Sequence, residues 1–114
     1  MLNVSINQLG DVVVIDLEGE FDIDVIRNVE NAWNEALAKK PRVIGFNCKE
    51  LKFIDSSALG TLVKFMNSAT NRKITLALFN VAPSVITIFK TSRLDKFFSI
   101  NTKEEFENKF LPVT

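Results

Sequence analysis

The sequence predicts a single α/β domain over residues 1–114, built on a mixed, largely parallel sheet of about four to five strands with about four helices. Two observations lead to this fold class. Segments rich in β-branched residues alternate with amphipathic segments of helical period, and strands joined by helices pair mainly in parallel. A length of 114 residues with 46% hydrophobic positions also suits one domain with its own core.

The first two strands form a predicted hairpin. Residues 2–6 alternate apolar and polar side chains, and residues 12–17 contain a β-branched run. Gly10 and Asp11 lie between these segments and favour a turn. We therefore expect an antiparallel pair at the start of the chain.

A helix and a covered strand come next. Over residues 24–39, apolar side chains recur at spacings of three and four, which predicts a helix with Trp33 in its buried stripe. Asp22 or Asp24 is the expected cap of this helix. Residues 43–46 are apolar on both faces, as in a strand inside a covered sheet.

The same alternation continues to the end of the chain. Helical spacing of apolar residues and runs of strand-forming residues follow one another, and Thr102 is the expected cap of the last helix. The predicted segments are a helix at 56–69, a strand at 74–79, a helix at 83–89, a short edge strand at 97–100 and a helix at 103–110.

Composition and charge exclude several functions. Histidine is absent and Cys48 is the sole cysteine, so an intrachain disulfide, a zinc site of Cys and His, and Ser/His/Asp or Cys/His catalysis are out of reach. Fourteen basic residues balance fourteen acidic ones, without the basic excess of a general nucleic-acid binder. We expect a protein that is not an enzyme, holds no metal or cofactor and makes no direct contact with nucleic acid.

The sequence also predicts a location. The N-terminal segment has no signal-peptide pattern, and no apolar run approaches the ~20 residues that a membrane helix needs. The lone Cys48 fits a reducing compartment. We therefore expect a cytoplasmic protein that does not enter a membrane.

The most informative segment joins an apolar strand directly to an amphipathic helix through the sequence Ile54-Asp55-Ser56-Ser57-Ala58-Leu59-Gly60. One interpretation is a helix N-cap, in which Asp55 or Ser56 accepts a hydrogen bond worth ~0.5–2 kcal/mol. The other is a phosphorylation site, because a helix N-terminus favours a negative group and a phosphate on Ser56 adds about −1.5 to −2 charges. Both interpretations can hold together, since a capping turn can also be a switch.

Four segments, taken in order, match the motifs of a known family. They are Gly19-Glu20-Phe21-Asp22, Ile54-Asp55-Ser56-Ser57-Ala58-Leu59-Gly60, Pro83-Ser84-Val85 with Ile88-Phe89, and Leu94-Asp95-Lys96-Phe97-Phe98. They resemble motifs of STAS domains, specifically of bacterial anti-sigma factor antagonists of the SpoIIAA and RsbV type, including their Asp-Ser-Ser-Gly-Leu-Gly signature. The resemblance covers nearly the whole chain and implies a STAS (SpoIIAA-like) fold.

The resemblance implies a partner-switching protein. Such antagonists bind an anti-sigma factor that is also a GHKL-type serine kinase, and so release a sigma factor for transcription. The kinase phosphorylates the first serine of the signature, which is Ser56 here, and the phosphorylated form dissociates. A PP2C-type phosphatase then restores binding. This chain would be both ligand and substrate, with ATP held by the kinase.

The expected partner-binding residues gather around the start of the second helix. They are Asp22, Asp55, Ser57, Ala58, Thr61 and Phe65. Ala58 stands where the family usually has glycine, and alanine is the better helix former by ~1 kcal/mol, which predicts a stiffer turn or a different partner interface. Phe65, with Ala58 and Thr61, is expected at the border of the buried stripe, where core periphery is the alternative to a partner contact.

Two other functions stay open at this point. One is a non-phosphorylated STAS adaptor or scaffold, in which Ser56 is only a cap. The other is a small-ligand sensor with an apolar pocket between sheet and helices. The apolar edge strands leave a monomer and a weak dimer both open.

Overall fold

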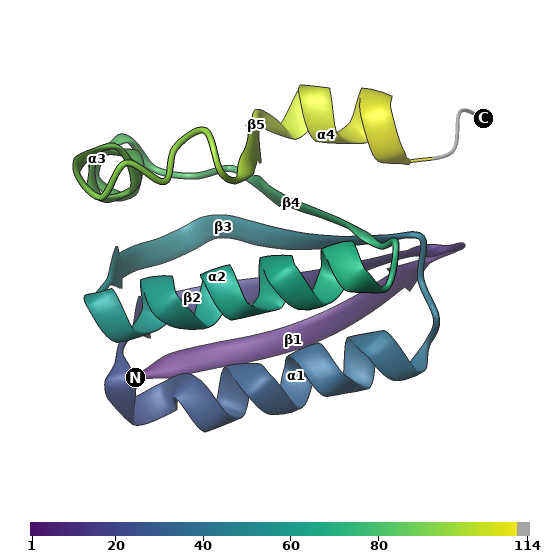
Figure 1. Ribbon diagram of the computed structural model, residues 1–114, viewed down its shortest axis with the longest axis horizontal. Coiled ribbons are helices and arrows are strands. Elements are labelled where there is room, and N and C mark those ends of the chain that lie inside the picture. Colours follow the sequence, from purple (N-terminus) through teal and green to yellow (C-terminus); the bar gives the residue numbers. More distant parts are fainter. Residues whose placement is uncertain (112–114) are drawn as a thin grey trace.

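The computed structural model describes residues 1–111, and its elements follow the order that the sequence predicts. A hairpin comes first, and helices then alternate with strands (Figure 1). The strands are β1 (Leu2–Leu9), β2 (Val12–Phe21), β3 (Val43–Ile54), β4 (Thr75–Phe79) and β5 (Ser99–Asn101). The helices are α1 (Ile26–Ala38), α2 (Ser56–Asn71), α3 (Pro83–Thr91) and α4 (Lys103–Phe110), with a 3-10 turn, η1 (Ile23–Val25), before α1.

The five strands form one sheet in the order β1-β2-β3-β4-β5. β1 and β2 are antiparallel and are joined by a turn in which Gly10 has a φ of +64°, a conformation that glycine adopts without strain. The other neighbours pair in parallel, which confirms the predicted mixed, largely parallel sheet. The carboxyl ends of β2, β3 and β4 meet at one edge, and the turns into α1, α2 and α3 gather there.

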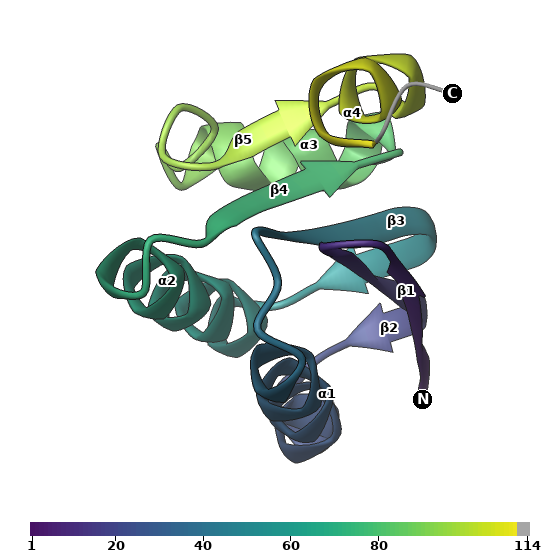
Figure 2. The ribbon, with the colours of Figure 1, turned by 90° about the vertical axis from the view of Figure 1, so that its right-hand side faces the viewer.

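Helices cover both faces of this sheet. α1 and α2 lie on one side and α4 lies on the other (Figure 2). The main core lies under α1, α2 and α3, where α3 contributes Val85 and Phe89. A smaller apolar cluster contains Phe106 of α4, whose ring stacks on Phe79 with centroids 4.1 Å apart. Within residues 1–111, none of the helices is long and apolar enough to cross a membrane.

Gly45 in β3 allows α4 to approach the sheet closely. A Cβ atom on Gly45 would lie 2.5 Å from Cζ of Phe106, well inside van der Waals contact. Arg42 adds a polar connection, since its Nε donates to Asp11 at 2.9 Å and its Nη2 donates to the carbonyl oxygen of Phe110 at 3.0 Å. The absence of a side chain at Gly45 and the guanidinium of Arg42 therefore both contribute to the position of α4.

β3 is longer than the sequence predicts. The expected strand covers residues 43–46, whereas β3 continues to Ile54 with register shifts against β2. Cys48, expected at the strand's end, lies buried inside it, and Lys49, Glu50 and Lys52 beyond it are exposed. Charged side chains on the solvent face of a strand interrupt the apolar run from which the strand is predicted, so the prediction ends too early. This extension carries the chain to the carboxyl edge of the sheet.

Candidate functional site

β3 passes into α2 through a single residue, Asp55. Asp55 is extended, with φ −100° and ψ 180°, and its Oδ1 accepts a hydrogen bond from the N–H of Ala58 at 2.8 Å. Asp55 is therefore the N-cap, which decides between the two residues that the sequence left open. Ser56 is exposed and Ser57 is half-buried. The Ser56 side chain thus lies at the positive end of the helix dipole and is accessible to solvent.

Asp55 also joins this turn to the loop before α1. Its Oδ2 accepts from the N–H of Ile23 at 3.0 Å, and its own N–H donates to the carbonyl oxygen of Phe21 at 3.2 Å. Asp22 accepts from the N–H of Asp24 at 3.0 Å and caps η1, the turn with which the predicted helix begins. The structure therefore brings the carboxylates of Asp22 and Asp55 to the same edge as the serines.

Two residues that the sequence analysis did not assign add to this surface. Ile23 is apolar, yet 65% of its surface is exposed. Its position between Asp22 and Asp24 is the sequence feature that indicates this exposure. Gly60 lies one turn after Ser56, and a Cβ atom there would meet nothing within 4 Å. Because residues four apart share a helix face, the bare backbone of Gly60 adjoins Ser56 and admits close approach of another molecule. We refer to Asp22, Ile23, Asp55, Ser56, Ser57 and Gly60 as the α2 edge.

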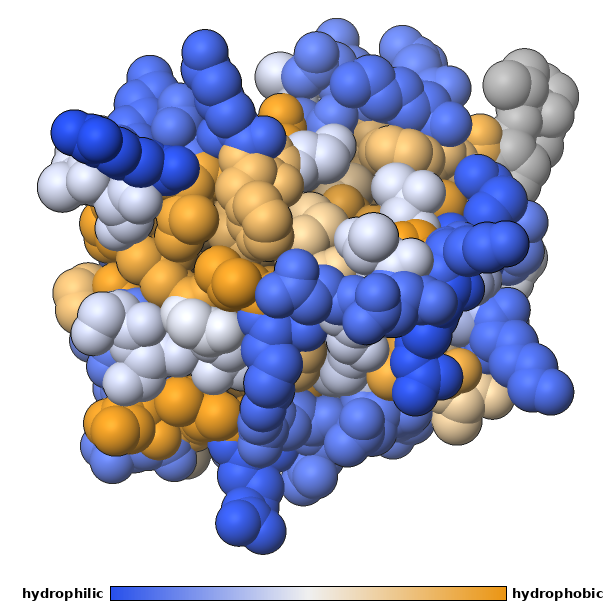
Figure 3. Space-filling model, in the orientation of Figure 1, coloured by the Kyte–Doolittle hydropathy of each residue, from blue (hydrophilic) through white to orange (hydrophobic). Residues whose placement is uncertain are grey.

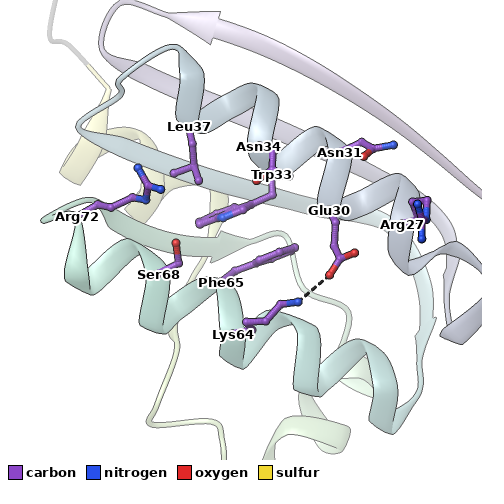
Figure 4. A pocket seen from close by; sticks show the side chains of 10 residues that line it. All are labelled: Arg27, Glu30, Asn31, Trp33, Asn34, Leu37, Lys64, Phe65, Ser68 and Arg72. Carbon is purple, nitrogen blue, oxygen red and sulfur yellow. Dashed lines mark hydrogen bonds and ion pairs between the residues drawn. The ribbon is translucent and has the colours of Figure 1, made fainter.

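Ala58, Thr61 and Phe65 do not lie on this surface. Their exposed fractions are 0%, 7% and 2%. The Thr61 hydroxyl donates to the carbonyl oxygen of Ser57 at 2.9 Å, and the Phe65 ring stacks on Trp33 with centroids 4.5 Å apart (Figure 4). The expectation that these three residues border the buried stripe is wrong, because α2 packs against α1 as well as against the sheet. The expectation that Trp33 lies in the core is confirmed.

The alanine that replaces the usual glycine of the signature is a core residue. Ala58 is fully buried, and its N–H donates to the Asp55 carboxylate. Its methyl group belongs to the main apolar cluster. The replacement therefore lies on the buried side of α2, whereas Ser56 is exposed.

The α2 edge offers the hydroxyls of Ser56 and Ser57, two carboxylates and a bare helix backbone. Burial raises the pKa of the Cys48 thiol to about 12, so this thiol stays protonated at neutral pH and is a poor nucleophile. Across residues 1–111, no cluster of three or more His, Cys, Asp or Glu residues is placed to hold a metal ion.

The space between the sheet and the helices α1 and α2 is occupied by aromatic rings, since Trp33, Phe46 and Phe65 stack there with near-parallel planes. A mainly apolar cavity of about 360 Å³, the kind that a small-ligand sensor would require, lies on the other face, where Val14, Phe79 and Phe106 line it beside α4. A groove of about 490 Å³ also opens on the outer surface between α1 and α2 (Figure 4). Its rim is polar and contains an ion pair of 2.7 Å between Lys64 and Glu30.

The fold is a mixed five-stranded sheet whose main core lies under α1, α2 and α3. An Asp-Ser-Ser turn opens α2 at the carboxyl edge of this sheet, so the protein is a small α/β domain that presents a serine at a helix N-terminus. The STAS domain family model matches residues 3–108, and the chain belongs to this family. A STAS-domain containing protein of Pseudomonas aeruginosa is 28% identical over 92 residues, which cover 81% of this chain and 90% of that protein.

Solved structures share the fold at lower sequence identity. A putative anti-sigma factor antagonist of Thermotoga maritima superposes with a TM-score of 0.84 at 21% identity, covering 93% of this chain and 92% of that one. The anti-sigma factor antagonist SpoIIAA in its unphosphorylated form gives 0.79 at 24% identity, covering 98% and 100%. Bacillus SpoIIAA in its phosphorylated form gives 0.71 at 24% identity, covering 94% and 98%. These similarities confirm the expected STAS (SpoIIAA-like) fold.

Proposed function

We propose that this protein is an anti-sigma factor antagonist that binds an anti-sigma factor, itself a GHKL-type serine kinase, and that phosphorylation of Ser56 releases this partner. The observation that carries the proposal is the position of Ser56, which is the exposed first residue of α2 on a STAS fold. The structural relatives support the class, since SpoIIAA is described as an anti-sigma factor antagonist and has unphosphorylated and phosphorylated forms.

Ser56 is suited to a charge switch because a phosphate at this position leaves the fold intact. The cap of α2 is made by Asp55, so a phosphoryl group on Ser56 removes no capping hydrogen bond. A helix N-terminus also favours a negative group. The phosphate adds about −1.5 to −2 charges beside the carboxylates of Asp22 and Asp55. The surface that a partner meets therefore becomes strongly negative while the backbone stays in place.

The remainder of the α2 edge supports a docking role. Ile23 provides exposed apolar surface, and Gly60 leaves the helix backbone bare. Hydrophobic surface also extends over the region between α2 and α3 (Figure 3), and these helices carry the half-buried apolar residues Val63, Met66 and Ile88. An apolar centre with a polar rim is the usual anatomy of a protein interface.

The proposed cycle needs no catalytic group from this chain. In the kinase, the Ser56 oxygen attacks the γ-phosphorus of ATP, ADP leaves, and the hydroxyl proton passes to a base of the kinase. The phosphorylated antagonist then dissociates, and the anti-sigma factor is free to bind its sigma factor. A PP2C-type phosphatase transfers the phosphoryl group to water, which yields inorganic phosphate and restores the Ser56 hydroxyl.

Phosphorylation by the host's GHKL-type serine kinases tests this proposal directly. After incubation with ATP and each kinase, we expect intact-protein mass spectrometry to show one added phosphate, and peptide mapping to place it on Ser56. The Ser56→Ala variant should gain none, whereas the matched Ser57→Ala variant should gain it normally. A phosphate on Ser57, or none with any active kinase, would overturn the switch and favour a STAS adaptor.

A further inference from the structure

β1 is an edge strand without the features that usually protect an edge. It is outermost in the sheet (Figure 2), and its eight residues, Leu2–Leu9, include no charged residue and no proline. Its register with β2 runs unbroken from the pair Leu2–Gly19 to the pair Leu9–Val12. Natural edge strands are usually short, charged or bulged, because a free row of N–H and C=O groups pairs with other chains.

The opposite edge of the same sheet has such protection. β5 contains only the three residues Ser99–Asn101, and α4 begins directly after it at Lys103. The side chain of Asn101 is turned inwards, where its Nδ2 donates to the carbonyl oxygen of Leu78 at 3.4 Å. The two edges of one sheet therefore differ, and within residues 1–111 no strand pairs with the outer side of the long uncharged one.

Alternate residues of β1 direct their backbone groups away from the sheet. The carbonyl oxygen of Met1 accepts a hydrogen bond from the N–H of Glu20 at 3.2 Å, so the odd-numbered residues bond to β2. Because bonding alternates along an antiparallel pair, the even-numbered residues between 2 and 8 point their N–H and C=O groups outwards. These N–H and C=O groups are positioned to form hydrogen bonds with one more strand.

The apolar face of β1 is incompletely covered by α1. Leu2 is buried, but Val4 and Ile6 are only half-buried. These three residues line a groove of about 470 Å³ between β1 and α1, which Asn28, Asn31, Ala32 and Glu35 complete. An added strand with apolar side chains on the same face would cover this groove.

The sequence of β1 is nearly symmetric about Ser5. On either side of Ser5 stand Val4 and Ile6, and beyond them Asn3 and Asn7. An antiparallel copy centred on Ser5 places Val4 opposite Ile6 of the second copy, on the α1 face. It places Asn3 opposite Asn7 of the second copy, on the other face. Apolar residues thus meet apolar ones and amides meet amides, so the strand is complementary to itself.

We propose that β1 pairs antiparallel with β1 of a second copy of this chain, which joins the two sheets into one continuous sheet. The absence of charge on the strand removes like-charge repulsion between the copies, and the symmetry about Ser5 selects an identical strand as partner. The start of β1 lies beside the end of β2 that leads to the α2 edge. Antiparallel pairing therefore places the two α2 edges at opposite ends, and the interface is independent of the proposed function.

Sedimentation velocity of the full chain tests the association. We expect a reversible monomer–dimer equilibrium between about 5 and about 500 μM, since an interface of this kind lies at the small end of the range. Ser5→Glu places like charges opposite each other at the two-fold axis, beside the Asp16 carboxylate that accepts from the Ser5 hydroxyl at 3.4 Å, and should weaken dimerisation at least tenfold. Ser92→Glu, the same change at an exposed serine after α3, should leave it unchanged. A wild-type chain that stays monomeric, or a Ser5→Glu variant that dimerises normally, overturns the proposal.

Disulfide cross-linking tests the register. Ser5 and Ser5 of the second copy form a non-hydrogen-bonded pair, whose Cα atoms lie ~4.5 Å apart, within reach of a disulfide. Ser5→Cys should therefore cross-link under mild oxidation, whereas Asn3→Cys, which faces Asn7 of the second copy, should not. Cys48 is buried and does not interfere. Cross-linking of both variants at the same rate would contradict pairing about Ser5.

Discussion

The Oδ2 atom of Asp55 accepts a hydrogen bond from the backbone N–H of Ile23 at 3.0 Å, across 32 positions of the chain. The other carboxylate oxygen, Oδ1, accepts from Ala58 and caps α2. One side chain therefore holds the loop before α1 against the turn that presents Ser56. The shape of the α2 edge depends on this carboxylate.

Loss of the Asp55 carboxylate should destabilise the protein. Asp55→Ala removes both hydrogen bonds, and we expect the free energy of unfolding to fall by about 1–3 kcal/mol. Urea unfolding followed by Trp33 fluorescence measures this change. Asp55→Asn keeps one acceptor oxygen and should lie between the wild type and Asp55→Ala. Equal stability of Asp55→Ala and wild type would show that neither bond contributes.

Charge at Ser56 should control partner affinity. Ser56→Ala should bind the anti-sigma factor like the wild type but accept no phosphate. Ser56→Asp should bind about tenfold more weakly at low salt, because one added carboxylate makes the α2 edge more negative, and the difference should shrink as salt rises. Titration calorimetry at two ionic strengths measures both effects, with Ser92→Asp as a control away from the edge. Unchanged affinity of Ser56→Asp would argue against an electrostatic switch.

Two glycine-to-alanine changes should have opposite effects on stability. Gly45→Ala places a methyl group 2.5 Å from the Phe106 ring, and we expect it to lower the free energy of unfolding by about 1–3 kcal/mol. Gly60→Ala adds the same methyl group where nothing lies within 4 Å. It should raise the free energy of unfolding by about 0.5–1 kcal/mol through helix propensity. Chemical denaturation compares them. A Gly45→Ala variant as stable as the wild type would contradict the packing described at Gly45, and a destabilised Gly60→Ala variant would contradict the open space described at Gly60.

Phe65 should contribute to stability and not to partner contact. Phe65→Ala removes a ring stacked on Trp33 and should cost about 3–5 kcal/mol. Phe65→Leu retains more of the apolar volume and should stay folded with wild-type affinity for the partner. Partner binding to Phe65→Leu, measured after circular dichroism has shown a native fold, tests this. Reduced affinity of the Phe65→Leu variant would indicate that Phe65 contacts the partner.

Two exposed carboxylates should make the C-terminal packing sensitive to acid. A hydrogen bond from Arg42 lowers the pKa of Asp11 below its ordinary 3.8, and the backbone N–H of Thr102 lowers the pKa of Glu105 below its ordinary 4.5. The native state thus binds fewer protons than the unfolded chain, so this stabilisation is complete above these ordinary values and is lost as pH falls through the lowered ones.

Urea midpoints measured between about pH 3 and pH 6 test this linkage. The wild type should lose stability towards acid, and Glu105→Gln should lose less because it has no proton to gain at that site. The same acid dependence in both proteins would show that Glu105 does not contribute. Asp11→Asn provides the corresponding test for the contact with Arg42.

The candidate site was predictable from the sequence only in part. The Asp-Ser-Ser turn was found because a helix N-terminus carries a local signal, and the structure places Asp22, Asp55, Ser56 and Ser57 together. The border position expected for Phe65 is wrong, because helical spacing shows a stripe without showing how wide it is. The sheet covers one part of that stripe and Trp33 of α1 covers another.

The sequence by itself determined the order of strands and helices and the start of α4. Thr102 caps α4 with both hydrogen bonds of a capping box present, because caps and periodicities depend on residues within about four positions of one another. The tertiary structure alone decided that β3 reaches Ile54, that Ile23 stays exposed beside Asp55 and that β1 remains an open edge. Each of these depends on contacts between segments far apart in the chain, which no local pattern contains.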